Sequence, residues 1–229
     1  MRRHHRAQFS LARMGRAIPS LLVTFALIVV WGAVLVRSMG SLDRFETTAG
    51  KPSNPPPRWP QQSCINHSTS RPTLVMLAHP HCPCTRASIG ELAVLMRYCV
   101  DRLDGYVLFF RPEGAPEGWE QTDLWDSASA IPGIRAVSDV GGQEARRFGA
   151  ATSGAVVLYD GHGQLLFSGG ITGSRGMSGE NDGRQSIVDL VSGKSSHLSS
   201  TPVFGCQILD SPNQAACCKQ RSKERACKP

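Results

Sequence analysis

Long and short apolar segments alternate along the chain, and the longest of them lies near the N-terminus. Residues 18–36 carry no charge and follow a basic segment, residues 1–17, that holds five arginines and no acidic residue. A helix of about 19 residues is roughly 28 Å long, close to the ~30 Å hydrocarbon core of a bilayer. The pattern predicts a transmembrane signal-anchor helix with its N-terminus in the cytoplasm, on the side of the arginines.

A cleaved secretory signal is the alternative interpretation of this segment. The apolar run is longer than the ~7 to 15 residues of a signal-peptide core, and no small-x-small cleavage site follows it, which favours an uncleaved anchor. Both interpretations export the rest of the chain. We therefore expect a single-pass protein of the inner (cytoplasmic) membrane, with its C-terminal domain in the periplasm or an equivalent extracytoplasmic space.

Shorter apolar segments predict a domain of alternating strands and helices over residues 72–195. Continuous apolar runs predict strands at 71–79, 105–110 and 134–139, and residues 154–170 predict a hairpin that turns at Asp160-Gly161. Helical periodicity or helix-ending signals predict helices over 85–100, 119–131, 141–150 and 183–193. The order β-α-β-α-β-α-β-β-α predicts an α/β fold with a central mixed sheet flanked by helices.

Composition changes on both sides of this domain. Residues 37–71 include five prolines within a short stretch, which predicts a Pro-rich linker that is semi-extended. Residues 196–229 form a Cys-rich basic tail.

The net charge of +7 is concentrated at the two ends of the chain. The N-terminal segment contributes +5 and residues 219–228 contribute +4, so the remainder carries −2. A near-neutral body lacks the basic face that phosphate contacts require, which excludes nucleic acid as an expected partner.

Eight cysteines in an exported chain fit an oxidising compartment, where disulfides persist. Cys99 lies on the apolar face of the helix over 85–100, so we expect it to be buried or paired, with Cys64 as a candidate partner. The tail contains Cys206, Cys217, Cys218 and Cys227 without the spacing of a zinc knuckle. Structural disulfides are the main expectation there, with a resolving role for Cys206 or a metal cluster as alternatives.

Residues 78–88, AHPHCPCTRAS, place Cys82 and Cys84 between a predicted strand and a predicted helix. A cysteine at a helix N-terminus is stabilised as the thiolate, and protonated His79 or His81 would lower its pKa further. A Cys82–Cys84 disulfide would close a small strained ring, which makes it easily reduced. This chemistry favours thiol–disulfide exchange over a purely structural disulfide, which is the alternative for the motif.

The element order, with this motif after the first strand, resembles the thioredoxin-like fold in its TlpA/peroxiredoxin-like variant, over about residues 72–192. More narrowly, CPCT, FSGGITGSRG and PVFGC are similar to segments of membrane-anchored RedB-like proteins. The resemblance implies a thiol:disulfide oxidoreductase without a cofactor, in which Cys82 attacks, Cys84 resolves and the two histidines tune the pKa. It also implies a substrate groove lined by Ser153, Gly154, Gly169 and Gly170. The implied partners are thiols or disulfides of exported client proteins and a membrane or periplasmic redox partner.

Three positions depart from the family pattern. The usual Cys-x-x-Cys is here Cys-Pro-Cys, and Gly154 stands where the family has a cis-proline. Peroxidases of this fold carry a threonine three residues before the reactive cysteine, whereas this chain has His79. Peroxide reduction is therefore disfavoured.

Two other functions stay open at this stage. His79, His81, Cys82 and Cys84 also form a ligand set suited to Cu(I) or Zn, which would make the chain a copper-handling or assembly protein similar to the Sco type. The domain could equally be a non-catalytic adaptor that keeps only the fold. Whether the protein is an enzyme thus depends on what these four side chains do.

Overall fold

A computed structural model describes residues 4–196 and 198–209 of the chain. The chain divides into two compact units, with the boundary between Phe45 and Glu46. Helix α1, His4–Thr47, accounts for the first unit and contains the whole predicted span, residues 18–36. Within the described residues, its portion Leu22–Thr47 is long and apolar enough to cross a membrane, a criterion that signal sequences also meet.

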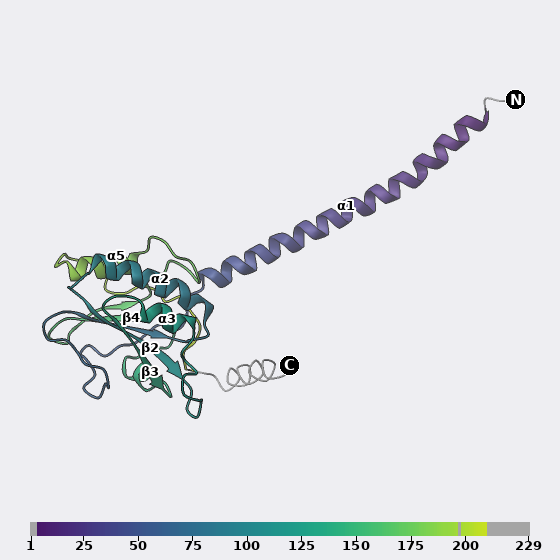
Figure 1. Cartoon of the computed structure of the whole chain (residues 1–229). Helices are drawn as coiled ribbons and strands as arrows, with labels where there is room; N and C mark the ends of the chain where they lie inside the picture. Colours follow the sequence, from purple (N-terminus) through teal and green to yellow (C-terminus); the bar gives the residue numbers. More distant parts are fainter. Residues whose placement is uncertain (1–3, 197, 210–229) are drawn as a thin grey trace. The chain divides into compact units, whose positions relative to one another are not determined.

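The second unit contains the elements predicted for the α/β domain, in the predicted order (Figure 1). They are β1 Thr73–Ala78, α2 Pro83–Tyr98, β2 Asp104–Arg111, α3 Asp123–Ser129, β3 Ile134–Val140, α4 Gln143–Arg147, β4 Ala155–Tyr159, β5 Leu165–Gly169 and α5 Asp182–Val191. The α/β fold class is thereby confirmed.

The five strands form one mixed sheet in the order β3-β2-β1-β4-β5. Strand β1 is central: it pairs in parallel with β2, in register from Thr73 with Asp104, and antiparallel with β4. Strand β3 extends the parallel half, and β5 completes the antiparallel hairpin with β4. The carboxyl end of β1 therefore lies between parallel and antiparallel neighbours, and the cysteine motif follows it directly.

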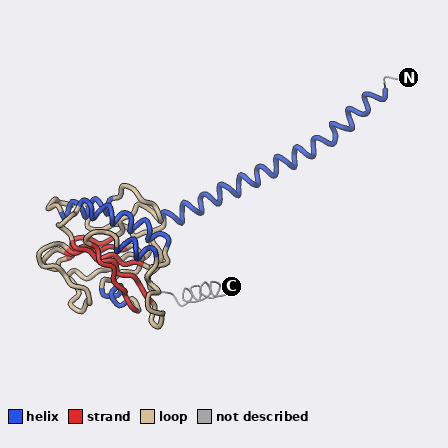
Figure 2. The backbone as a smooth tube through the Cα atoms, in the orientation of Figure 1, coloured by secondary structure: helices blue, strands red, loops and turns tan. Residues whose placement is uncertain are grey.

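The two faces of the sheet are covered differently (Figure 2). Helices α2, α3 and α5 pack on one face, where Leu92, Leu124 and Ile187 join alternate residues of β1 in one core. The short helix α4 and two irregular segments cover the other face, over a second core that includes Trp59 and Phe148. Because both faces are covered, every residue of β1 is buried.

The structure of residues 37–71 differs from the semi-extended linker that the sequence predicts. Residues 37–47 continue helix α1, and the proline-rich part packs on the domain, with Trp59 only 9% exposed. The Trp59 N–H donates to the Gly163 carbonyl at 2.8 Å, and the Pro56 carbonyl accepts from the Tyr159 hydroxyl at 2.9 Å. Prolines lack an N–H, but their carbonyls still accept, so an extended proline segment can lie against a sheet without unpaired donors.

The predicted domain end at residue 195 is also too early. Residues 198–209 follow the domain surface, and Val203 and Ile208 are buried in the second core. The Ser168 N–H donates to the Ser199 carbonyl at 3.0 Å, which places this segment beside the edge strand β5. We refer to residues 198–209 as the C-terminal segment. The rest of the predicted tail, including Cys217, Cys218 and Cys227, lies outside the described residues.

Candidate functional site

Cys82 lies at the junction between β1 and α2. Strand β1 ends at Ala78, and the Cys82 N–H donates to the His79 carbonyl at 3.1 Å, which closes a tight turn. Cys82 is then the N-cap of α2, and Pro83 occupies the first helical position, where its fixed φ and missing N–H fit a helix start. The sequence C-P-C therefore begins the helix with its first cysteine facing unpaired backbone donors.

Three cysteines converge at this point. The sulfur atoms of Cys82, Cys84 and Cys206 all lie within 4.8 Å of one another. Cys82 and Cys84 are 2% and 8% exposed, and Cys206 is partly buried. The sequence motif predicts a pair formed by Cys82 and Cys84. Cys206 belongs to the C-terminal segment, beyond the last helix. The site is therefore a three-thiol cluster, and none of its members is in a disulfide.

Hydrogen bonds stabilise Cys82 as the thiolate. The Cys206 thiol donates to the Cys82 sulfur, and this contact is the main reason that the Cys82 pKa falls to about 4. Burial acts in the opposite direction, while the Thr85 hydroxyl and the backbone N–H groups of both partners add to the lowering. At neutral pH the cluster thus holds one anion, on Cys82.

The other two thiols stay protonated. The Cys206 pKa is raised, first because its proton is held by the Cys82 sulfur and then by burial. Burial and the Cys82 anion raise the Cys84 pKa, against the opposing effect of the Arg175 guanidinium, which hydrogen-bonds to it. Arg175 also donates to the Gly205 carbonyl at 2.5 Å and to the Thr48 carbonyl at 3.2 Å. It joins the helix start to the C-terminal segment.

The loop before β4 contacts the turn and the helix that carry Cys82 and Cys84. The Ser153 hydroxyl lies 2.7 Å from the Thr85 hydroxyl and accepts from the His79 N–H at 2.8 Å. Gly154 has φ +88°, and its N–H donates to the Leu77 carbonyl at 2.8 Å. Among the described residues no peptide bond is cis. Ser153 and Gly154, predicted as groove residues, therefore lie beside the cysteines.

Gly169 and Gly170, the other predicted groove residues, face the C-terminal segment. A Cβ on Gly169 would lie 2.3 Å from the Thr201 hydroxyl, and one on Gly170 would lie 2.5 Å from the Pro202 carbonyl. These glycines permit close backbone packing of that segment. The structure therefore separates the predicted groove set into two pairs.

The two histidines lie in an aromatic group next to the cluster. The His79 ring stacks on Phe110 with centroids 5.7 Å apart, and the His81 and Trp119 rings form a T-shaped pair with centroids 4.5 Å apart. The His81 N–H donates to His79 Nδ1 at 3.2 Å. The largest contributions to the Cys82 pKa come from Cys206, burial and Thr85, and tuning of the Cys82 pKa by the two histidines stays a prediction.

The predicted metal-ligand set does not assemble as a group. Within the described part of the chain, the potential ligands that come together are the sulfurs of Cys82, Cys84 and Cys206, and neither His79 nor His81 belongs to that group. The two histidines follow the end of β1 and lie in the turn before α2.

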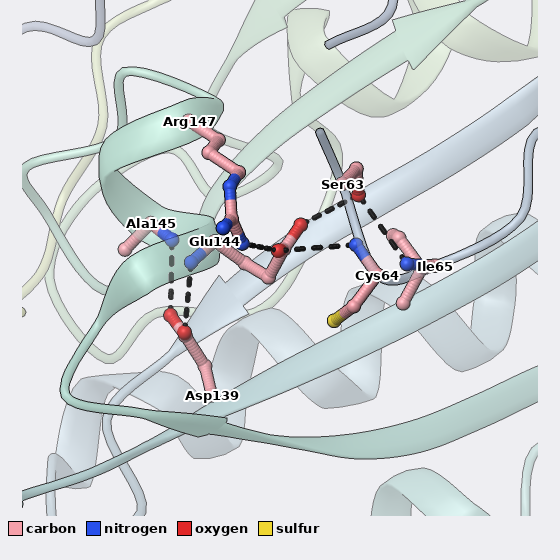
Figure 3. Close-up of polar contacts among 7 residues, drawn as sticks. All are labelled: Ser63, Cys64, Ile65, Asp139, Glu144, Ala145 and Arg147. Carbon is pink, nitrogen blue, oxygen red and sulfur yellow. Dashed lines mark hydrogen bonds and ion pairs between the residues drawn. The ribbon is translucent and has the colours of Figure 1, made fainter. Parts of the chain in front are cut away.

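The two other described cysteines lie apart from the cluster. Cys99 is fully buried in the core beneath α2, α3 and α5, as predicted. Cys64 is exposed on the opposite side of the sheet, where its N–H donates to the Glu144 carboxylate at 3.3 Å (Figure 3). Glu144 also accepts from Ser63 at 2.6 Å and pairs with Arg147. Because the sheet separates them, the Cys64–Cys99 pairing considered from the sequence is wrong.

Two residues of the site carry no strong sequence signal. Thr85 is part of CPCT, and its signal is weak: a hydroxyl three residues after a helix-capping cysteine is placed to face it. Arg175 is one basic residue in a glycine-rich loop, and only the fold brings it to Cys84.

Comparison with known proteins supports the fold. No protein-family model and no curated protein matches the chain. A hypothetical protein from Sinorhizobium meliloti 1021 and an uncharacterized conserved protein from Geobacillus kaustophilus both have similar structures, each with a TM-score of 0.53 and 19% identity. Each match covers 72% of this chain, and 96% and 94% of the respective chains. A putative thioredoxin from Neisseria meningitidis aligns with a TM-score of 0.42 and 16% identity, over 67% of this chain and 95% of its own. With a strand, a cysteine turn, a helix and a closing antiparallel hairpin, the domain has a thioredoxin-like fold.

Proposed function

We propose that this protein is a membrane-anchored thiol:disulfide oxidoreductase that acts on exported proteins. The observation that carries the proposal is the Cys82 sulfur, held at a helix start by neutral donors and within 4.8 Å of two further thiols. A stabilised thiolate beside a second thiol is the arrangement that thiol–disulfide exchange requires.

In the proposed reaction, the Cys82 thiolate attacks one sulfur of a client disulfide. A mixed disulfide forms between Cys82 and the client, and the other client sulfur leaves as a thiolate. A neighbouring thiol then attacks Cys82 and releases the client as a dithiol. The sequence motif favours Cys84 for this second step, and the reverse reaction would oxidise a client dithiol.

The proposed location rests on helix α1. An apolar helix preceded by five arginines favours an N-terminus in the cytoplasm and a domain on the opposite, periplasmic side. Disulfide chemistry is useful there, because disulfides persist in oxidising compartments. Carbonate extraction of membranes tests the anchor, and a chain that is released into the soluble fraction contradicts it. Protease treatment of spheroplasts tests the orientation, and a domain that resists digestion as cytoplasmic proteins do contradicts it.

A redox titration of the full chain in a mild detergent tests the activity. The chain is equilibrated over a series of glutathione ratios, thiols are trapped, and the oxidation state of each cysteine is read by mass spectrometry. We expect a Cys82 disulfide that interconverts within the range of the buffer and disappears in Cys82→Ser. Cys99→Ser is the matched control, because that buried thiol lies away from the cluster. A Cys82 that neither oxidises nor reduces would contradict the proposed oxidoreductase activity.

A soft metal is the second candidate ligand, and the three-sulfur cluster is the observation that favours it. Three thiolates suit Cu(I), and a thiolate already present on Cys82 reduces the number of protons that binding must displace. This candidate retains the copper-handling alternative but replaces its histidine ligands by Cys206. Running the same titration with and without Cu(I) separates the two functions.

A further inference from the structure

The C-terminal segment lies along the loop before β4 in the manner of a bound peptide. The Ser153 N–H donates to the Cys206 carbonyl at 2.7 Å, and the Ile208 N–H donates to the Ala151 carbonyl at 3.0 Å. Between them, Thr152 and Gln207 form an antiparallel bridge. This alternation of donors and acceptors is the pattern by which an extended peptide adds to an exposed backbone edge. It directs Cys206 at the Cys82 sulfur.

Close packing holds the segment in this position. A Cβ on Gly205 would lie 1.9 Å from the Ser153 carbonyl, so only glycine permits this approach. The Arg175 guanidinium holds the Gly205 carbonyl, and Ile208 is 1% exposed in the core below. These contacts hold the segment so that Cys206 faces Cys82.

Cys84 is less well placed to form a disulfide with Cys82. The two cysteines are separated by one proline in the first turn of α2, so their disulfide closes a small strained ring. The Cys84 sulfur is also hydrogen-bonded by Arg175. Cys206 is distant in the sequence, so its disulfide with Cys82 closes a large loop without that ring strain. Both thiols hydrogen-bond to Cys82, but the bond from Cys206 is the largest cause of the lowered Cys82 pKa.

We propose that Cys206, not Cys84, is the cysteine that resolves the mixed disulfide on Cys82. The inference rests on the proposed oxidoreductase function and assigns its second step. The Cys206 sulfur attacks the Cys82 sulfur, the bond between Cys82 and the client sulfur breaks, and the Cys206 proton passes to the departing client thiolate. The client thiolate released in the first step takes a proton from water, so the client disulfide gains two electrons and two protons in all, while the Cys82 thiolate and the Cys206 thiol are oxidised to a disulfide.

The charge on Cys82 determines the sequence of the two steps. While Cys82 is an anion, it holds the proton of Cys206 and raises the Cys206 pKa, so Cys206 is unreactive. Formation of the mixed disulfide removes the Cys82 charge and with it the main cause of that raised pKa. Cys206 then ionises more easily and attacks. Resolution is thereby coupled to the capture of a client.

Disulfide mapping with oxidised glutathione tests this assignment on the full, reduced chain in detergent. Samples are quenched with N-ethylmaleimide at set times, digested and analysed by mass spectrometry. In the native chain and in Cys84→Ser we expect a transient glutathione adduct on Cys82, followed by a Cys82–Cys206 disulfide. In Cys206→Ser we expect the adduct to persist at least ~10-fold longer, because the resolving thiol is missing. Cys64→Ser, which removes an exposed thiol away from the cluster, should behave as native.

The outcomes distinguish the inference from the function on which it rests. If the adduct in Cys206→Ser resolves at the native rate into a Cys82–Cys84 disulfide, or one with a cysteine after residue 209, the inference is overturned and the function stands. If Cys82 forms no adduct in any variant, both are overturned.

Gly205→Ala tests the docking while all three thiols remain. The added Cβ meets the Ser153 carbonyl, so the segment must shift, and we expect the adduct to persist several-fold longer than in the native chain. Gly173→Ala is the matched control, because nothing lies within 4 Å of its Cβ position. If the adduct in Gly205→Ala is resolved at the native rate, the docked segment does not position Cys206 for the attack.

Discussion

The Cys206 thiol donates a hydrogen bond to the Cys82 sulfur, and this contact moves the pKa values of the two cysteines in opposite directions. The Cys82 pKa falls to about 4, whereas the Cys206 pKa rises. A charge-assisted hydrogen bond is stronger than a neutral one, so the pair is most stable with one proton, on Cys206. The reactive anion is thus maintained by a neighbouring thiol, without a cationic partner as the main cause.

The first prediction concerns the pH dependence of alkylation. The rate at which iodoacetamide modifies Cys82 should rise with pH around an inflection near 4 and then level off, because the thiolate is the nucleophile. Cys206→Ala removes the main donor and should move the inflection upward. Cys206→Ser keeps a hydroxyl donor and should lie between the two. Peptide mapping of the alkylated site at each pH provides the measurement.

Cys64→Ala is the control for this profile, since Cys64 is an exposed thiol that does not belong to the sulfur cluster. Its Cys82 inflection should match that of the native chain. An unchanged inflection in Cys206→Ala would show that the hydrogen bond does not set the Cys82 pKa.

The second prediction concerns the stability of the reduced protein. Cys82 has a pKa of about 4 when folded and an ordinary value of 9.0, so between these values the unfolded chain binds the additional proton. The free energy of unfolding should therefore increase with pH in this window, by at most about 1.4 kcal/mol per pH unit. The contribution is fully present above pH 9 and is lost as the pH falls through 4.

Urea denaturation of the native chain and of Cys82→Ala, both kept reduced in detergent, measures this effect between pH 5 and 8. The native chain should gain stability relative to the variant as the pH rises, because other titrating groups are common to both. Parallel curves would contradict a thiolate on Cys82.

Much of the fold follows from local patterns in the sequence. The uninterrupted apolar run of β1 predicts a strand covered on both faces, and the spacing of Ile89, Leu92 and Leu95 predicts the buried face of α2. The cysteine at the helix start follows from the order of these two elements. Each of these predictions depends on neighbouring residues, so a single sequence suffices for them.

What the sequence could not predict depends on contacts between distant segments. Nothing local to Cys206 shows that its backbone pairs with Ser153, and nothing local to Arg175 shows that it reaches Cys84. The proline-rich residues before β1 have the composition of a free linker, yet Trp59 gives that segment an apolar anchor in the second core. Such contacts become visible only when the fold brings the segments together.

The third prediction concerns the Ser153 hydroxyl, which connects the loop before β4 to the cysteine turn. Ser153 is 1% exposed, and its hydroxyl contacts both the Thr85 hydroxyl and the His79 N–H. Ser153→Ala leaves the buried Thr85 hydroxyl and the partly buried His79 N–H without this partner, which should lower the free energy of unfolding by roughly 1 to 3 kcal/mol. Ser127→Ala removes an exposed hydroxyl bond and should cost less than about 0.5 kcal/mol. Equal effects in urea denaturation would show that the buried contact adds no stability.

The fourth prediction separates the two possible sets of metal ligands. Two sulfurs bound to one ion at ~2.3 Å lie at most ~4.6 Å apart, so sulfurs within 4.8 Å of one another need to move only slightly to share Cu(I). Competition with a chromogenic Cu(I) chelator should show more than ~10-fold weaker binding in Cys206→Ser and about native binding in His79→Ala. Cys99→Ser is the control for loss of a thiol outside the cluster. The opposite result, binding that depends on His79 but not on Cys206, would restore the histidine-containing set and show that the three-thiol cluster is not the metal site.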